Sequence, residues 1–141
     1  MAACPRAITS EMHLTDEPAR ILVVDDDAAS LDLVTTWLRS HGYAVSQADD
    51  GNRAASLGTE EKFDLVILDV HMPTYDGIEI LRFLRKRYVR RPVKVIALTA
   101  DSTESVRNEL TRYGIDSYMT KPVELKALLD EVQRLLEQSD R

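Results

Sequence analysis

Aspartates directly follow two short apolar segments of this chain. Residues 25–27 are all aspartate and come after the apolar residues 21–24, and Asp69 comes after residues 65–68. Carboxylates held in one cleft repel each other, and the repulsion is relieved when one of them binds a proton or when a cation binds between them. A hard divalent cation such as Mg²⁺ takes one or two carboxylates together with water and phosphate oxygens. The pattern therefore predicts a cation site, provided that the two segments are neighbours in the fold.

A hydroxyl and an ammonium group follow two further apolar segments. Thr99 ends the segment 93–98, and Lys121 comes shortly after residues 117–119. Carboxylates are established covalent acceptors of phosphoryl groups, and a metal ion, a lysine and a hydroxyl offset charge on the transferred oxygens. With Mg²⁺ bound, the carboxylates of Asp25, Asp26 and Asp69 and the Lys121 ammonium leave the cleft without net charge. Such a cleft suits phosphoryl transfer onto an aspartate.

The elements that position these residues alternate regularly along the chain. Short apolar segments, expected to be strands, span residues 21–24, 43–48, 65–68, 93–98 and 117–119. Segments expected to be helices span residues 28–41, 52–57, 76–88, 103–113 and 124–137. Five strand–helix units predict an α/β fold with a doubly wound, parallel sheet. In the strand order 2-1-3-4-5 the first and third strands are neighbours, so their terminal aspartates converge.

Length and composition bound the domain organisation and the function class. The chain has 141 residues and a formal net charge of −6, which fits one domain and argues against a nucleic-acid-binding surface. We expect a poorly ordered extension over residues 1–19, one domain over 20–138 and a short tail over 139–141. The single cysteine and three scattered histidines exclude a disulfide framework and a Cys- or His-based metal cluster. No segment has a membrane-span or signal-peptide pattern, so a cytoplasmic protein that binds neither membrane nor nucleic acid is predicted.

Four motifs, taken in this order, carry a family resemblance. They are the acidic pair 25–26, DVHMP at 69–73 with DG at 76–77, ALTA at 97–100, and YMTKP at 118–122. Over roughly residues 20–137 the sequence resembles the receiver domain of two-component response regulators, of the chemotaxis-regulator kind. The resemblance implies a flavodoxin-like (βα)5 fold, with a five-stranded parallel sheet in the order 2-1-3-4-5.

The resemblance also implies a role for each residue of the acidic cleft. Asp69 is the expected phosphoacceptor, Asp26 the direct Mg²⁺ ligand, and Asp25 a ligand that acts mainly through bound water. The backbone carbonyl of His71 completes the protein's share of the metal shell, and Mn²⁺ is an alternative to Mg²⁺. These residues are thus expected to form one metal and phosphoryl site.

Three further residues are implied to hold or sense the phosphoryl group. Thr99 and Lys121 would bind phosphoryl oxygens, and Tyr118 would change its orientation on activation. The peptide bond between Lys121 and Pro122 is expected to be cis, which aims the lysine at the site.

Two side chains flanking the site are expected to control how long the phosphoryl group persists. His71 lies two residues past Asp69, and Asp101 lies two residues past Thr99. The receiver family uses these positions to control the access of the attacking water. We therefore expect His71 and Asp101 to set the dephosphorylation rate.

Other conspicuous residues are explained by structure alone. We expect Asp27 and Asp76 to cap the helices that follow them, and Trp37 to belong to the core. The basic run over residues 82–91 is expected to form a solvated face, with favourable positive charge at a helix C-terminus.

The predicted function is that of a phosphorylation-controlled signalling domain rather than an enzyme, with intrinsic autophosphorylation and autodephosphorylation chemistry. A sensor histidine kinase or histidine phosphotransfer protein would supply the phosphoryl group. A face formed by helix 103–113, strand 117–119 and helix 124–137 would then change shape for a downstream protein. A homodimer formed on phosphorylation is an alternative.

Competing functions fit the residues less well. A haloacid-dehalogenase-like phosphatase also uses an aspartate nucleophile with Mg²⁺, but it expects a hydroxyl where Ala29 stands. A flavodoxin-like electron carrier needs an anion cradle after the first strand, where three aspartates would repel a flavin phosphate. The five glycines form neither a P-loop nor a dinucleotide fingerprint.

Overall fold

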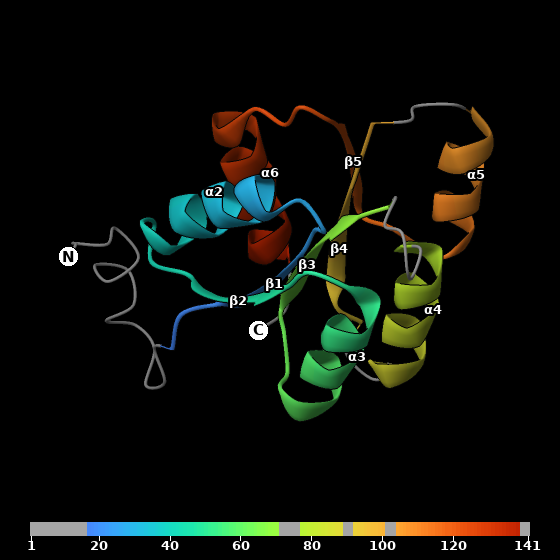
Figure 1. The fold of residues 1–141 in the computed structure, drawn as a ribbon, viewed down its shortest axis with the longest axis horizontal. Coiled ribbons are helices and arrows are strands. Elements are labelled where there is room, and N and C mark those ends of the chain that lie inside the picture. The colour runs from blue at the N-terminus through green and yellow to red at the C-terminus, as the bar shows by residue number, and fades with distance from the viewer. Residues whose placement is uncertain (1–16, 71–76, 89–91, 101–103, 139–141) are drawn as a thin grey trace.

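A single parallel sheet forms the centre of the molecule in the computed structural model, which describes residues 17–70, 77–88, 92–100 and 104–138. All neighbouring strands pair in parallel, in the order β2-β1-β3-β4-β5 (Figure 1). The strands are β1 (Arg20–Val24), β2 (Ala44–Ala48), β3 (Leu65–Asp69), β4 (Lys94–Thr99) and β5 (Ser117–Thr120). The helices are α2 (Ala28–Arg39), α3 (Gly51–Glu60), α4 (Gly77–Arg87), α5 (Glu104–Arg112) and α6 (Leu125–Gln138). The predicted fold and strand order are confirmed.

Helices cover both faces of this sheet, which makes a three-layered molecule (Figure 1). Helices α2 and α6 pack on one face, and α3, α4 and α5 pack on the other. Successive side chains of a strand point to opposite faces, so in β1 Ile21 and Val23 join the first core and Leu22 and Val24 join the second. This double burial explains why the strands are continuous apolar runs rather than alternating ones.

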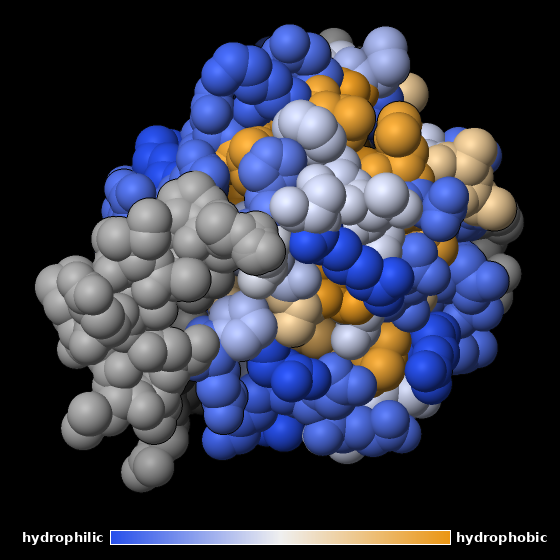
Figure 2. All heavy atoms as spheres, turned by 90° about the vertical axis from the view of Figure 1, so that its left-hand side faces the viewer, coloured by the Kyte–Doolittle hydropathy of each residue, from blue (hydrophilic) through white to orange (hydrophobic). Residues whose placement is uncertain are grey.

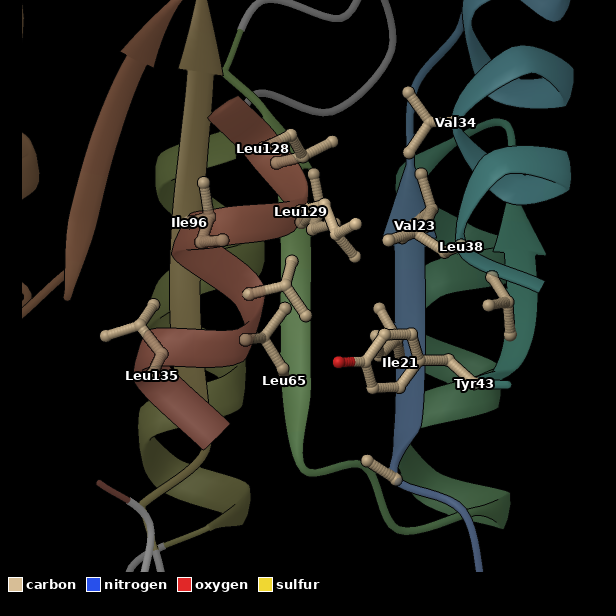
Figure 3. Close-up of a cluster of buried hydrophobic side chains, with 14 of the residues drawn as sticks. Ile21, Val23, Val34, Leu38, Tyr43, Leu65, Ile96, Leu128, Leu129 and Leu135 are labelled. Atoms are coloured by element: carbon tan, nitrogen blue, oxygen red, sulfur yellow. The ribbon is translucent and has the colours of Figure 1, made fainter. Parts of the chain in front are cut away.

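The core between the sheet and helices α2 and α6 is shown in Figure 3. Its labelled members from the strands include Ile21, Leu65 and Ile96, and α6 contributes Leu128 and Leu135. Each of these five side chains is at most 2% exposed, and full burial of an aliphatic side chain stabilises a fold by roughly 1.5–3 kcal/mol. This packing fixes the strands whose ends carry the acidic residues.

The single tryptophan connects two distant parts of this face. Trp37 of α2 packs against the first core, as predicted, and its indole N–H donates to the carbonyl of Leu125 at 2.9 Å. Its ring also meets the His41 ring edge-on, with centroids 4.5 Å apart. Trp37 therefore joins α2 to the start of α6.

Aspartates start two of the helices. The Asp27 carboxylate accepts from the backbone N–H of Ser30 and caps α2, as predicted. Asp50 caps α3 in the same way, through the N–H of Arg53 at 2.7 Å, and so α3 begins earlier than the expected residue 52. The predicted cap Asp76 lies outside the described residues.

Helix α3 also runs further than predicted, through Gly58 to Glu60. A Cβ added to Gly58 would lie 3.1 Å from Cε2 of Phe83 on α4. Glycine therefore lets α3 and α4 pack closely here. This packing explains why α3 continues beyond residue 57, where the prediction ended it.

Among the described residues of the basic run, Arg85 does not follow the predicted role. Arg82, Lys86 and Arg87 are exposed, as expected for a solvated face. Arg85 instead turns inward, and its guanidinium donates to three carbonyls at the start of β4 and between α5 and β5, those of Val93, Tyr113 and Gly114. The last carbonyls of a helix lack partners within it, so Arg85 caps the end of α5 from another element.

The surface seen from the left-hand side of Figure 1 mixes polar and apolar residues. Apolar residues occur there in small groups separated by polar ones (Figure 2). Among the described residues, Leu33 of α2 is the large apolar side chain that lies exposed, at 55%. Within the same residues, no helix has the length and apolar character needed to cross a bilayer. The predicted domain boundaries at residues 19 and 138 stay predictions.

Candidate functional site

The carboxyl ends of β1 and β3 bring the predicted acidic residues together. Val24 pairs with Leu68, so Asp25 and Asp69 follow at neighbouring positions of one sheet edge. Both are buried, at 3% and 4% exposure, whereas Asp26 is exposed. Carboxylate oxygens of the three residues all lie within 4.8 Å of one another. The convergence of these aspartates, predicted from the sequence, is confirmed.

Lys121 lies between the two buried carboxylates. Its Nζ is 3.2 Å from Asp25 Oδ2 and 3.4 Å from Asp69 Oδ2. Burial disfavours the ammonium, but the charges of Asp69 and Asp25 outweigh that cost and raise the pKa of Lys121 above its ordinary value. The lysine is therefore a permanent cation at neutral pH. The peptide bond between Lys121 and Pro122 is cis, as predicted.

The loop after β1 fixes the remaining oxygen of Asp25. The backbone N–H of Asp27 donates to Asp25 Oδ1 at 2.9 Å, while Asp25 Oδ2 faces Lys121. Hydrogen bonds from Ser30 lower the pKa of Asp27, with a smaller contribution from the Lys121 charge. Asp25 thus has a partner for each oxygen, and the neighbouring Asp26 projects into solvent.

Thr99 ends β4 at the same edge of the sheet. It is 0% exposed, and its carbonyl accepts from the backbone N–H of Lys121 at 2.9 Å. On the neighbouring strand, Asp69 pairs with Leu98, the residue before Thr99. The predicted hydroxyl, ammonium and carboxylates therefore share one edge of the sheet.

Tyr118 lies on β5, two residues before the end of that strand. It pairs with Ala97 of β4, and its half-buried ring packs against the core under α3, α4 and α5. The guanidinium carbon of Arg107, on α5, lies 5.0 Å from the centroid of the ring. Apart from the helical position of Arg107, no sequence pattern predicts this contact.

Two predicted site residues lie outside the described part of the structure. They are His71, with its carbonyl and its side chain, and Asp101. The described residues supply the three carboxylates, the ammonium, the hydroxyl and the tyrosine. They present hard oxygen donors and one cation, which are the donor types that a divalent metal ion and a phosphoryl group require.

An acidic cluster at the carboxyl ends of a parallel 2-1-3-4-5 sheet is the arrangement expected of a receiver domain. A family model described as the response regulator receiver domain matches residues 21–133. The chain therefore belongs to the response regulator receiver domain family of two-component systems. The matches give no support to the phosphatase alternative.

Curated relatives agree with this assignment. The chain is 35% identical over 130 residues to the transcriptional regulatory protein ResD of Bacillus subtilis, covering 92% of this chain and 52% of that protein. It is 41% identical over 119 residues to the response regulator MprA of Mycolicibacterium vanbaalenii, covering 84% of this chain and 51% of that protein. The chain spans about half the length of these two relatives.

Solved structures share the fold closely. A CheY-like response regulator receiver domain protein from Methanospirillum hungatei JF-1 superposes with a TM-score of 0.79 at 31% identity, covering 86% of this chain and 95% of that one. The response regulator TrrA of Thermotoga maritima, in complex with Mg²⁺ and BeF, gives a TM-score of 0.73 at 34% identity, covering 83% and 98%.

Proposed function

We propose that this receiver domain accepts a phosphoryl group on Asp69 from a sensor histidine kinase or a histidine phosphotransfer protein. One observation carries the proposal. The buried Asp69 carboxylate lies within 4.8 Å of two further carboxylates and 3.4 Å from the Lys121 ammonium. The carboxylates at this edge of the sheet can bind a metal ion, and Lys121 can bind a phosphoryl oxygen.

Asp26 and Asp69 would hold the metal ion directly, together with the carbonyl of His71, and Asp25 would act through water. Support for the indirect role of Asp25 comes from its two oxygens, which already accept from the N–H of Asp27 and from Lys121. Mg²⁺ is the proposed ion, with Mn²⁺ as an alternative, because the ligands are all oxygens. When bound, the ion offsets negative charge on the phosphoryl oxygens.

The side chains then act on the transferred group. An Asp69 carboxylate oxygen forms a bond to phosphorus as the bond from phosphorus to the donor nitrogen breaks, and that nitrogen keeps the electron pair. Lys121, held as a cation by its neighbours, binds one phosphoryl oxygen, and the Thr99 hydroxyl donates to another. The same geometry accepts small acyl phosphates, which gives intrinsic autophosphorylation. Attack of water on phosphorus later breaks the bond to the Asp69 oxygen, which releases inorganic phosphate and restores the carboxylate.

The signal leaves through Thr99 and Tyr118. The acyl phosphate carries more negative charge than the carboxylate and attracts the Thr99 hydroxyl, and Tyr118 reorients into the space behind it. The face formed by α5, β5 and α6 then binds a downstream protein, with phosphorylation-dependent homodimerisation as an alternative. Nucleic acid and membrane are not partners of this domain, and it acts in the cytoplasm.

The lifetime of the phosphoryl group is assigned to the side chains of His71 and Asp101. Both follow a functional residue by two positions, Asp69 and Thr99 respectively. Replacing both with alanine should change the dephosphorylation rate and leave Mg²⁺ affinity nearly unaltered. An unchanged rate would show that other residues control the attacking water.

Intact-mass measurement after incubation with acetyl phosphate and Mg²⁺ tests the acceptor. The wild-type chain should gain the mass of one HPO₃ group. Asp69→Asn should gain none, because the amide has the shape of the carboxylate but is not a nucleophile, and Asp32→Asn, on the exposed side of α2, should behave as wild type. A single adduct that persists in Asp69→Asn would contradict the assignment. Multiple turnover of phosphate esters would favour the phosphatase instead.

A further inference from the structure

We infer that Arg107 of α5 is a gate residue for Tyr118. Its guanidinium stabilises the tyrosine ring in its present, half-buried position and so opposes the reorientation that accompanies phosphorylation. The inference rests on the proposed function, since it concerns how readily the site switches. Arg107 lies outside the phosphorylation site, yet it would set the balance between the two positions of the Tyr118 ring.

The contact joins a helix and a strand through a cation and an aromatic face. The guanidinium carbon of Arg107 is 5.0 Å from the centroid of the Tyr118 ring, within the roughly 6 Å over which a cation is attracted to a ring. Arg107 is exposed and Tyr118 is half-buried against the core. The arginine therefore covers the solvent side of a ring whose other side contacts protein.

The strand beside Tyr118 offers the ring a route inward. Its partner on β4 is Ala97, a buried residue with one of the smallest side chains. Thr99 lies two residues further along the same strand and so points to the same face of the sheet as Ala97. A ring that leaves Arg107 and crosses Ala97 thus approaches the hydroxyl that the phosphoryl group attracts.

The gate requires that this contact is lost when the ring moves towards Thr99. The contact then weights the equilibrium towards the present, half-buried position of the ring. A cation–π contact at an exposed site changes such an equilibrium by roughly twofold to fivefold. Only the difference between the two states matters, because a contact made equally in both would shift nothing. Arg107 therefore shifts the equilibrium of the ring modestly and does not prevent its reorientation.

Three single variants test the gate, each with a distinct expectation. Arg107→Gln keeps a long polar side chain but removes the cation, and Arg107→Lys keeps the charge but loses the planar guanidinium. Arg112→Gln is the matched control, because it removes the same charge from another exposed arginine of α5. Both positions are on the surface, so the fold should be preserved.

The measurements are the affinity for beryllofluoride in the presence of Mg²⁺ and the ¹⁹F spectrum of protein labelled with 3-fluorotyrosine. Beryllofluoride stands in for the phosphoryl group on Asp69, and a Tyr118→Phe sample assigns the resonance. Arg107→Gln should bind beryllofluoride roughly twofold to fivefold more tightly than wild type, and its Tyr118 resonance should shift towards the activated position before activation. Arg107→Lys should lie between the two, and Arg112→Gln should match wild type.

A double-variant cycle separates the gate from a general charge effect. In a Tyr118→Leu background, Arg107→Gln should no longer change the beryllofluoride affinity, because the ring that it contacts is gone. Mg²⁺ affinity measured without beryllofluoride should be the same in wild type and Arg107→Gln.

The possible failures are distinguishable. If wild type binds no beryllofluoride, the proposed phosphorylation function is wrong and the gate falls with it. If wild type binds it but Arg107→Gln binds with equal or lower affinity, the proposed function stands and the gate is wrong. An equal gain in Arg112→Gln, or a gain that survives in the Tyr118→Leu background, would also overturn the gate.

Discussion

The two ends of the sheet differ in how their charged side chains are paired. At the carboxyl end, the buried Asp25 and Asp69 both face Lys121, and negative charge is in excess among the residues that the structure describes there. At the amino end, Arg85 donates to three carbonyls and lies 3.6 Å from the carboxylate of Asp116. The carboxyl end has negative charge that a bound cation can neutralise. At the amino end, the charged side chains named here are paired within the chain.

A second group at the amino end follows the same pattern. The backbone N–H of Arg20, the first residue of β1, donates to Asp64 Oδ2 at 2.8 Å, and its guanidinium donates to Glu61 Oε1. These contacts tie the entry of β1 to the segment before β3. We propose that the matched charges of the amino end serve stability, whereas the excess of carboxylates at the carboxyl end serves binding.

Removing Arg85 should have the largest effect on stability. Arg85→Met keeps the aliphatic packing but leaves three carbonyls without their donor, two of them in part-buried hydrogen bonds. This should lower the free energy of unfolding by about 3 kcal/mol. Urea denaturation measures this loss. Arg82→Met, an exposed neighbour on α4, should change it by no more than about 0.5 kcal/mol. Equal effects of the two variants would contradict the distinction between matched and solvated cations.

Metal binding should stabilise the chain through the carboxyl end alone. Mg²⁺ at 100 times its dissociation constant should raise the free energy of unfolding by about 2.7 kcal/mol, because it binds only the folded cleft. Asp26→Ala should abolish this gain by removing a direct ligand, which thermal unfolding with and without Mg²⁺ would show. Asp32→Ala should retain the full gain. If Asp26→Ala keeps it as well, the metal does not bind where proposed.

Without metal, removing one carboxylate from the crowded end should be tolerated. Asp69→Asn relieves like-charge repulsion around Asp25 and Asp26 and should raise the metal-free free energy of unfolding by about 1 kcal/mol. Adding Mg²⁺ should reverse the order, since wild type alone then gains the bound ion. A metal-free Asp69→Asn that is clearly less stable than wild type would show that Lys121 already neutralises the cleft.

Acid should weaken the amino end through Glu131 of α6. Its carboxylate accepts from Arg134 and from Ser117 at the start of β5, and these hydrogen bonds lower its pKa to about 2. A depressed pKa gives stability that is present above the ordinary pKa near 4.5 and is lost as the pH falls towards 2. Because the pair is partly exposed, the loss should stay below about 1 kcal/mol. Urea denaturation from pH 6 to 3 should show this loss in wild type and not in Glu131→Gln.

The sequence was sufficient for the parts of the site that strand ends determine. Asp25, Asp69 and Thr99 stand where apolar runs stop, and in a parallel sheet those stops share one edge. Their convergence therefore followed from periodicity together with the strand order that the family resemblance implied. Lys121 lies within two residues of β5 and was placed by the same reasoning.

Long cations on helices could not be placed in this way. Arg85 and Arg107 stand among other charged residues at ordinary helical spacing, yet one caps the end of another helix and the other covers a tyrosine. Which of several similar side chains turns inward depends on carbonyls and rings from distant segments. For the same reason α3 is longer than predicted, because its last turn packs against Phe83 of α4 at Gly58.

The hydrogen bond between Trp37 and Leu125 makes the chain its own optical probe. Trp37 is the only tryptophan in the sequence, so its fluorescence comes from a single, known location. Leu125 follows Lys121 by four residues, and movement of that connection would alter the polarity around the indole. Emission intensity and wavelength, followed in a stopped-flow instrument after mixing with acetyl phosphate, would thus time the response of α6 without any added label.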